Sequence, residues 1–94
     1  MKLLQTEFTK KGTTYKQLEK NERYVLYQCT TTEGCTYYEI FKYRVKPYPM
    51  QWESTNTNGY TQYEVYPSDE EFGKCAWCCS SLDRAKKMIT KHSL

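Results

Sequence analysis

The chain has 94 residues, the size of one domain with one modest core, so we expect residues 1–94 to form a single domain. Its net charge is +3, with acidic residues interspersed among basic ones, so charge alone does not indicate a nucleic-acid-binding protein. Ten of the 94 residues are tyrosines, which serve either to complete a core or to present a binding surface.

The N-terminus and the cysteine content predict an intracellular protein. Only Leu3 and Leu4 precede the polar residues, which is too short an apolar run for a signal peptide or a membrane span. Five cysteines, an odd number, fit a reducing compartment better than a disulfide framework. We therefore expect a cytoplasmic protein with no membrane partner.

The first third of the sequence predicts three strands. Residues 3–9 are a short strand candidate, and Gly12 can supply the positive φ of a turn that follows it. Residues 13–20 again favour β-structure. Residues 23–31 alternate as a strand does, with Val25, Tyr27 and Cys29 on one face and Tyr24, Leu26 and Gln28 on the other.

The middle of the sequence predicts a central strand and a hairpin. Residues 35–45, CTYYEIFKYRV, are the longest β-rich segment, and large apolar side chains on both faces predict that a helix covers one of them. Further on, Asn58 and Gly59 are typical of a two-residue hairpin loop. That loop would place Glu53 opposite Glu64, so we expect a slipped register or a loose excursion at its tip.

The last third predicts a turn, a strand and a helix. Pro67 starts the turn, and residues 72–79 form the final strand. Ser80 is the predicted N-cap of a helix that runs to about residue 91, with Asp83 at its third position. An apolar stripe that must cover the sheet consists of Leu82, Ala85, Met88 and Ile89. The predicted fold is α+β, an antiparallel meander of five or six strands with one C-terminal helix packed on one face.

The cysteines and the histidine do not predict a catalytic or metal site. Cys75 and Cys78 have C-x-x-C spacing, but on a strand they point to opposite faces, and His92 is the sole histidine. A buried cysteine behaves as a small apolar side chain. No paired base, thiol and orienting group, and no glycine-rich phosphate loop, is present. We expect a non-enzymatic protein without a metal or cofactor, and the role of the thiols stays open.

Two surfaces are candidates for binding. On the first, the segment EVYPSDEEF combines acids with aromatic residues, as a protein that occupies a basic groove would, and the alternative is an ordinary polar turn. On the second, basic and aromatic residues interleave on a strand and a basic helix follows, as in single-strand nucleic-acid binders, and the alternative is a solvated face. The partner-binding candidates are Tyr66, Asp69, Glu70, Glu71 and Phe72, and the nucleic-acid candidates are Tyr38, Lys42, Arg44, Lys86 and Lys87.

Four segments, KGTTYKQL, YEIF, YPSDEEFGK and AWCCSSLDRA, also carry a family resemblance. The chain resembles small uncharacterised proteins encoded by phages and prophages, over about two thirds of its length. The resemblance implies a sheet-plus-helix fold and a mobile-element origin, and it brings no catalytic residue. The chain departs from the pattern at Cys78 and Cys79, where an aromatic or other apolar residue is expected.

The leading hypothesis is therefore a non-enzymatic phage or mobile-element accessory protein that binds a host protein or protein complex. It would act as an inhibitor of a host nuclease or defence system, in the manner of an anti-CRISPR protein. A small nucleic-acid-binding module is the first alternative. A structural or assembly protein that forms a homo-oligomer through an edge strand is the second.

Overall fold

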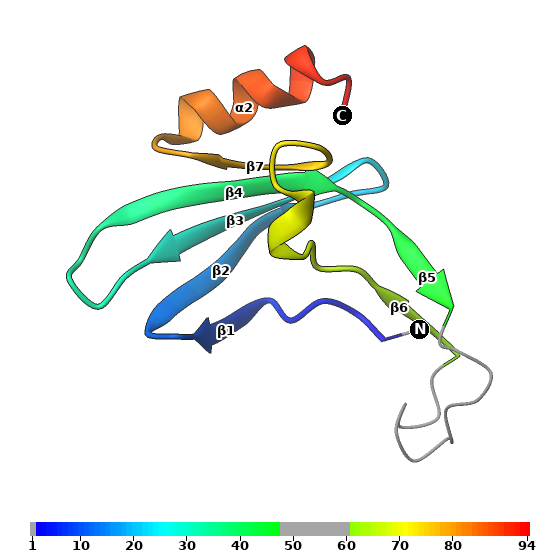
Figure 1. The fold of residues 1–94 in the computed structure, drawn as a ribbon, viewed down its shortest axis with the longest axis horizontal. Coiled ribbons are helices and arrows are strands. Elements are labelled where there is room, and N and C mark those ends of the chain that lie inside the picture. Colours follow the sequence, from blue (N-terminus) through cyan, green and yellow to red (C-terminus); the bar gives the residue numbers. More distant parts are fainter. Residues whose placement is uncertain (1, 48–60) are drawn as a thin grey trace.

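The protein is described by a computed structural model that covers residues 2–47 and 61–94. In this part of the chain a five-stranded antiparallel sheet has the order β1–β2–β3–β4–β7, and one α-helix, α2, follows β7 (Figure 1). The sheet consists of β1 (Glu7–Lys10), β2 (Thr13–Lys20), β3 (Tyr24–Thr30), β4 (Thr36–Lys42) and β7 (Ala76–Cys79). The remaining elements are β5 (Val45–Pro47), which pairs with β6 (Gln62–Glu64), the short 3-10 helix η1 (Asp69–Glu71), and α2 (Leu82–Lys91). The predicted α+β meander with a C-terminal helix is confirmed.

Side-chain alternation gives the sheet a separate core on each face. The aromatic core, as we name the first, contains the buried residues Val25, Tyr27, Cys29, Phe41 and Ala76. The helix core, on the opposite face, contains the buried residues Leu26, Ile40, Cys79, Ala85 and Leu94. The predicted stripe of α2 covers this second face, since Leu82, Met88 and Ile89 pack against the helix core.

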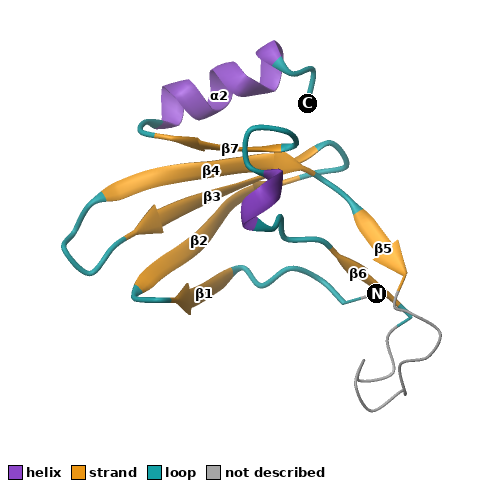
Figure 2. Ribbon diagram, viewed as in Figure 1, coloured by secondary structure: helices purple, strands orange, loops and turns teal. Residues whose placement is uncertain are grey.

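Two irregular segments cover the aromatic core. Leu4 and Phe8 come from the N-terminal segment and β1, and Tyr66 and Phe72 come from the chain that runs from β6 through η1. Figure 2 shows this second segment and η1 lying over the sheet on the side away from α2. The acidic turn predicted from the sequence is therefore a cover of the aromatic core.

Several predicted strand boundaries are wrong. The strand predicted over residues 3–9 begins only at Glu7, where pairing with β2 starts. The N-terminal segment before Glu7 runs beside β6, and there the Lys2 N–H donates to the Gln62 carbonyl at 2.9 Å. The strand predicted over residues 35–45 is divided into β4 and β5, because the Tyr43 N–H turns to the Arg23 carbonyl at 2.9 Å. The predicted Asn58–Gly59 hairpin and Glu53 lie outside the described residues.

The C-terminal boundaries are shifted in the same way. The final strand begins at Ala76 instead of residue 72, because Gly73, with a φ of 93°, lies in a turn before it. The helix N-cap is Ser81 instead of Ser80, and its hydroxyl accepts a hydrogen bond from the Arg84 N–H at 3.2 Å. Asp83 remains in the first helical turn, where its charge complements the helix dipole.

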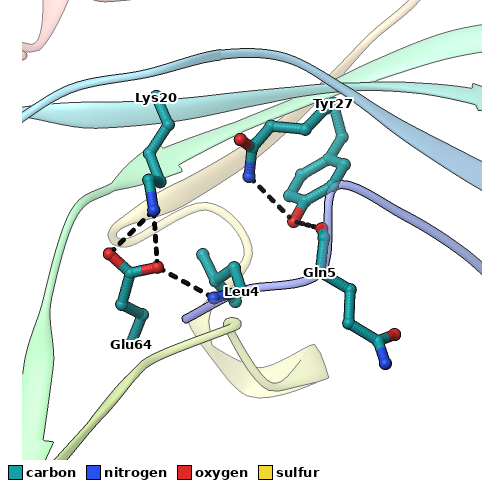
Figure 3. A network of polar contacts seen from close by, with 6 residues as sticks. Leu4, Gln5, Lys20, Tyr27 and Glu64 are labelled. Atoms are coloured by element: carbon teal, nitrogen blue, oxygen red, sulfur yellow. Dashed lines mark hydrogen bonds and ion pairs between the residues drawn. The ribbon is translucent and has the colours of Figure 1, made fainter. Parts of the chain in front are cut away.

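A buried ion pair joins the N-terminal segment, β2 and β6. The Glu64 side chain is 2% exposed, and the Lys20 ammonium lies 2.8 and 3.1 Å from its two carboxylate oxygens (Figure 3). The Leu4 N–H donates to the same carboxylate at 2.8 Å. Burial acts to raise the pKa of Glu64, but the hydrogen bonds from Lys20, Tyr43 and the Leu4 N–H outweigh burial and hold that pKa below its usual value.

A second polar contact ties the N-terminal segment to the sheet. The hydroxyl of the buried Tyr27 donates to the Gln5 carbonyl at 2.6 Å and accepts from the Gln17 amide at 3.3 Å. Figure 3 places this contact beside the Glu64 ion pair. The N-terminal segment is thus held at two successive residues, Leu4 and Gln5, although it contains no strand of the main sheet.

We predict that Glu64→Gln lowers the free energy of unfolding at pH 7 by about 2 kcal/mol, because a charge-assisted buried acceptor becomes a neutral one. The folded pKa of Glu64 is depressed, so its contribution is present above the unfolded pKa and is lost as pH falls through the folded pKa. Urea unfolding at pH 7 and at pH 3 measures both effects, and the difference between the two proteins should shrink at pH 3. Glu33→Gln, at an exposed hairpin, is the matched control.

Candidate functional site

The candidate site is the acidic turn around η1 together with the hollow beside it. Its backbone is fixed by Ser68, whose carbonyl accepts from the Glu71 N–H at 3.0 Å. The Ser68 N–H and hydroxyl each lie 3.2 Å from one oxygen of the Glu71 carboxylate and donate to it. This reciprocal contact between residues three apart resembles a capping box and is what allows so short a helix to form.

The Glu71 carboxylate also connects the turn to the rest of the molecule. Its second oxygen accepts from the Cys75 thiol at 3.2 Å and forms an ion pair with the Arg44 guanidinium. The Cys75 and Ser68 hydrogen bonds, with the charge of Arg44, lower the pKa of Glu71 to about 2. Glu71 is therefore ionised throughout the physiological range and acts as a structural anchor of the turn.

Tyr66 enters the aromatic core just before the turn. Its ring lies 5.4 Å from that of Phe41 and 5.8 Å from that of Phe8, with edge-to-face geometry in both cases. Its hydroxyl donates to the carboxylate of Glu39 on β4. Burial, with the hydrogen bond to Glu39, raises the pKa of Tyr66 far above its usual value, so the phenol stays protonated and remains a donor.

Glu39 is one of the residues that line the hollow beside the turn. The hollow has a volume of about 390 Å³ and is lined by Tyr37, Glu39, Asp69, Phe72 and Cys78. Glu39 is 7% exposed, and burial raises the pKa of its carboxyl despite the hydrogen bond from Tyr66 and the charge of Lys10. Carboxyl groups with a shifted pKa beside a surface hollow are frequent at functional sites, so this hollow belongs to the candidate site.

The predicted partner-binding residues fall into two groups according to their contacts. Tyr66 and Glu71 are held in contacts within the protein, whereas Asp69 and Glu70 are exposed and Phe72 lines the hollow. Within residues 2–47 and 61–94, neither the Asp69 nor the Glu70 carboxylate forms an ion pair. Asp69 and Glu70 are therefore the charges of the set that are free to meet a partner, beside the half-buried Phe72.

Two of the five predicted nucleic-acid residues are engaged in contacts within the protein. Tyr38 packs against the helix core, and the Arg44 guanidinium is paired with Glu71. Lys42 is exposed at the end of β4, while Lys86 and Lys87 are exposed on α2. The Arg44 Nε is buried without a hydrogen-bond partner among the described residues, although the side chain as a whole is 29% exposed.

The five cysteines are all unpaired thiols, and the described residues contain no group of three or more metal-ligating side chains. Cys29 and Cys79 are buried as parts of the two cores, whereas Cys35 and Cys78 are exposed. Although Cys78 as a residue is exposed, partial desolvation of its sulfur, with the charge of Glu39, raises the pKa of Cys78 and makes its thiolate less available at neutral pH.

Glu39 was missed as a site residue, although the sequence contained a signal for it. Glu39 alternates with Tyr37 and Phe41 on the strand YYEIF, so it had to share their face of the sheet. A carboxylate on an otherwise apolar face needs a partner, and Tyr66 supplies it from 27 positions away. The sequence gives no indication of which residue that partner is.

Comparison with protein-family models, with curated proteins and with solved structures found no match. In the described part of the chain, no helix has both the length and the apolar character needed to cross a membrane.

We predict that Glu39→Gln raises the stability of the protein at neutral pH. The folded pKa of Glu39 is raised, so its contribution to stability is greatest below the unfolded pKa and is lost as pH rises through the folded pKa. Glutamine imitates the protonated acid and can still accept from Tyr66. Urea unfolding from pH 4 to pH 8 should show a difference that grows with pH, and an equal difference at every pH would contradict the assignment.

Proposed function

We propose that the protein acts by binding another protein through the acidic turn and performs no catalysis. The observation that carries the proposal is that the three acids of η1 differ in their contacts. Glu71 holds the turn through its ion pair and hydrogen bonds, whereas Asp69 and Glu70 are exposed on a backbone that is already fixed. A partner therefore meets two carboxylates whose positions cost little entropy to order.

The charge of the turn indicates the kind of partner. Two free carboxylates beside the partly buried Phe72 suit a basic surface with an apolar patch, because complementary charge accelerates encounter and fixes orientation. The rest of the protein carries a net positive charge, so the turn is the locally distinct surface. A basic groove of a nucleic-acid-processing enzyme has this character.

The proposal that the partner is a protein of a bacterial host rests on the resemblance to phage and prophage proteins. Small accessory proteins of phages commonly act by blocking host enzymes, so we propose a nuclease or a defence complex in the cytoplasm of a bacterial host as the partner. Inhibition in the manner of an anti-CRISPR protein would follow if the acidic turn occupies the groove that normally receives nucleic acid.

The charge-reversal variant Asp69→Lys/Glu70→Lys tests the acidic turn without touching its anchor. We expect it to reduce capture of the host partner from a bacterial extract about tenfold, because two attractive contacts become repulsive. Glu22→Lys/Glu33→Lys makes the same change of net charge at two exposed hairpin residues and should leave capture unchanged. Quantitative mass spectrometry of the captured proteins gives the comparison.

Other results of this experiment would point to the alternatives. Equal capture by the two double variants would contradict the role of the acidic turn. Loss of capture after nuclease treatment of the extract would favour the nucleic-acid-binding alternative, and a stable homo-oligomer in light scattering would favour the assembly alternative. Glu71 must be left unchanged, since a lysine there would also break the contacts that hold the turn.

A further inference from the structure

A groove between β7 and α2 forms a second charged surface, of opposite sign to the acidic turn. It has a volume of about 460 Å³, and Cys78, Cys79 and Ser80 line it at the end of the strand. From the helix it receives Arg84, Lys87 and Lys91, with Met88 between them. The three cations are spaced three and four residues apart, which places them along one stripe of the helix.

The groove contains no compensating charge from the protein. The residues that line it include no acid. Within the described ranges 2–47 and 61–94, Arg84, Lys87 and Lys91 also form no ion pair. The groove thus holds three positive charges that an anionic ligand could neutralise.

The strand beside the groove has an edge that is open at one residue, because Phe72 already forms a β-bridge with Ala76. β7 is the last strand of the sheet, and the Lys42 N–H donates to the Cys75 carbonyl at 2.9 Å. Because antiparallel pairs alternate, Trp77 and Cys79 direct their backbone groups to β4, and Ala76 and Cys78 direct theirs outward. The Ala76 carbonyl accepts from the Gly73 N–H at 2.6 Å, which leaves the N–H and C=O of Cys78 at the edge.

We propose that this groove binds an acidic peptide segment of a partner protein in extended conformation, as an added strand on β7. The open backbone groups of Cys78 would pair with the peptide main chain, as in other cases of β-strand addition. Acidic side chains on the face toward α2 would meet the three cations. The stripe from Arg84 to Lys91 is about 10 Å long, and same-face residues of a strand are about 6.7 Å apart, so two acids fit along it.

The chemistry of the groove favours a peptide over a nucleic acid. No aromatic side chain lines it, whereas proteins that bind single strands stack the bases on aromatic rings. A strand edge offers N–H and C=O groups at the spacing of another peptide backbone. The groove shares Cys78 with the hollow beside the acidic turn, but no residue of η1 lines it, so the two surfaces can be tested by separate charge variants.

Neighbouring lysines on α2 provide a matched test. Lys86 and Lys87 are both exposed and carry the same charge, but only Lys87 lines the groove. The probe is a fluorescein-labelled eight-residue peptide that alternates glutamate and valine, titrated with the full chain. Lys87→Glu should weaken binding about fivefold, since an exposed attraction becomes a repulsion, while Lys86→Glu should change it less than about twofold.

Two modified probes separate a strand from a mere polyanion. A peptide with glutamine in place of glutamate should lose the dependence on Lys87, and one with N-methyl groups on alternate backbone nitrogens should bind at least about fivefold more weakly than the parent. Equal effects of Lys86→Glu and Lys87→Glu, or undiminished binding of the N-methylated peptide, would overturn the proposal. Tighter binding of a single-stranded oligothymidylate than of the acidic peptide would assign the groove to nucleic acid instead.

The two exposed thiols locate the bound peptide independently of charge. Cys78 lines the groove at the edge of β7 and also the hollow beside the acidic turn, where Glu39 and Asp69 would repel an acidic peptide, and Cys35 lies on the β3–β4 hairpin. The acidic peptide should slow maleimide labelling of Cys78 and leave that of Cys35 unchanged, as measured by mass spectrometry of the digested protein. Equal protection of both thiols, or of neither at saturating peptide, would place the peptide elsewhere and contradict the proposal.

Discussion

The arrangement of the chain over the aromatic core depends on the buried carboxylate of Glu64. It brings together three parts of the chain that the main sheet does not join, since Lys20 belongs to β2, Leu4 to the N-terminal segment and Glu64 itself to β6. A carboxylate that is 2% exposed would be costly without those partners. With them it places the chain after β6 over the aromatic core, and so positions Tyr66 and the acidic turn beyond it.

A hierarchy of carboxylates follows from that placement. Glu64 fixes the cover, Glu39 receives the hydroxyl of Tyr66, and Glu71 fixes the turn to Arg44 and Cys75. Each of these acids has partners inside the protein and a pKa that its surroundings shift. Asp69 and Glu70 have no such internal partners and are exposed, so their charge is available for recognition.

Local pattern predicted the main strands and the helix, with shifted boundaries, but not the contacts that arrange them. Alternation placed Val25, Tyr27 and Cys29 on one face correctly, and helical spacing found the stripe that includes Ala85. The role of Glu71 in the turn depends on Arg44, which is 27 residues earlier in the chain. Nothing in the sequence near either residue indicates that pairing, so the acids of the turn looked equivalent.

The same limit applies to the two charged surfaces. Tyr38 and Arg44 were grouped as nucleic-acid candidates because they share a strand pattern with Lys42. In the structure Tyr38 packs against the helix core and Arg44 is paired with Glu71, so neither is free for a ligand. The groove at Lys87 requires the edge position of β7, which depends on strand order. Charge can be counted from a sequence, but whether that charge is free can be decided only from tertiary contacts.

The strand order also has a kinetic consequence. Strands β1 to β4 follow one another as hairpins, whereas β7 reaches β4 only after the chain between Lys42 and Ala76 has closed into a loop. Loop closure costs entropy before it gains contacts, so the meander of β1 to β4 can form first. We expect β7 and α2 to dock last during folding and to detach first during unfolding. The acidic turn lies within that loop, and the groove between β7 and α2 follows it in the chain. A ligand bound at either surface would therefore stabilise the part of the molecule that opens most readily.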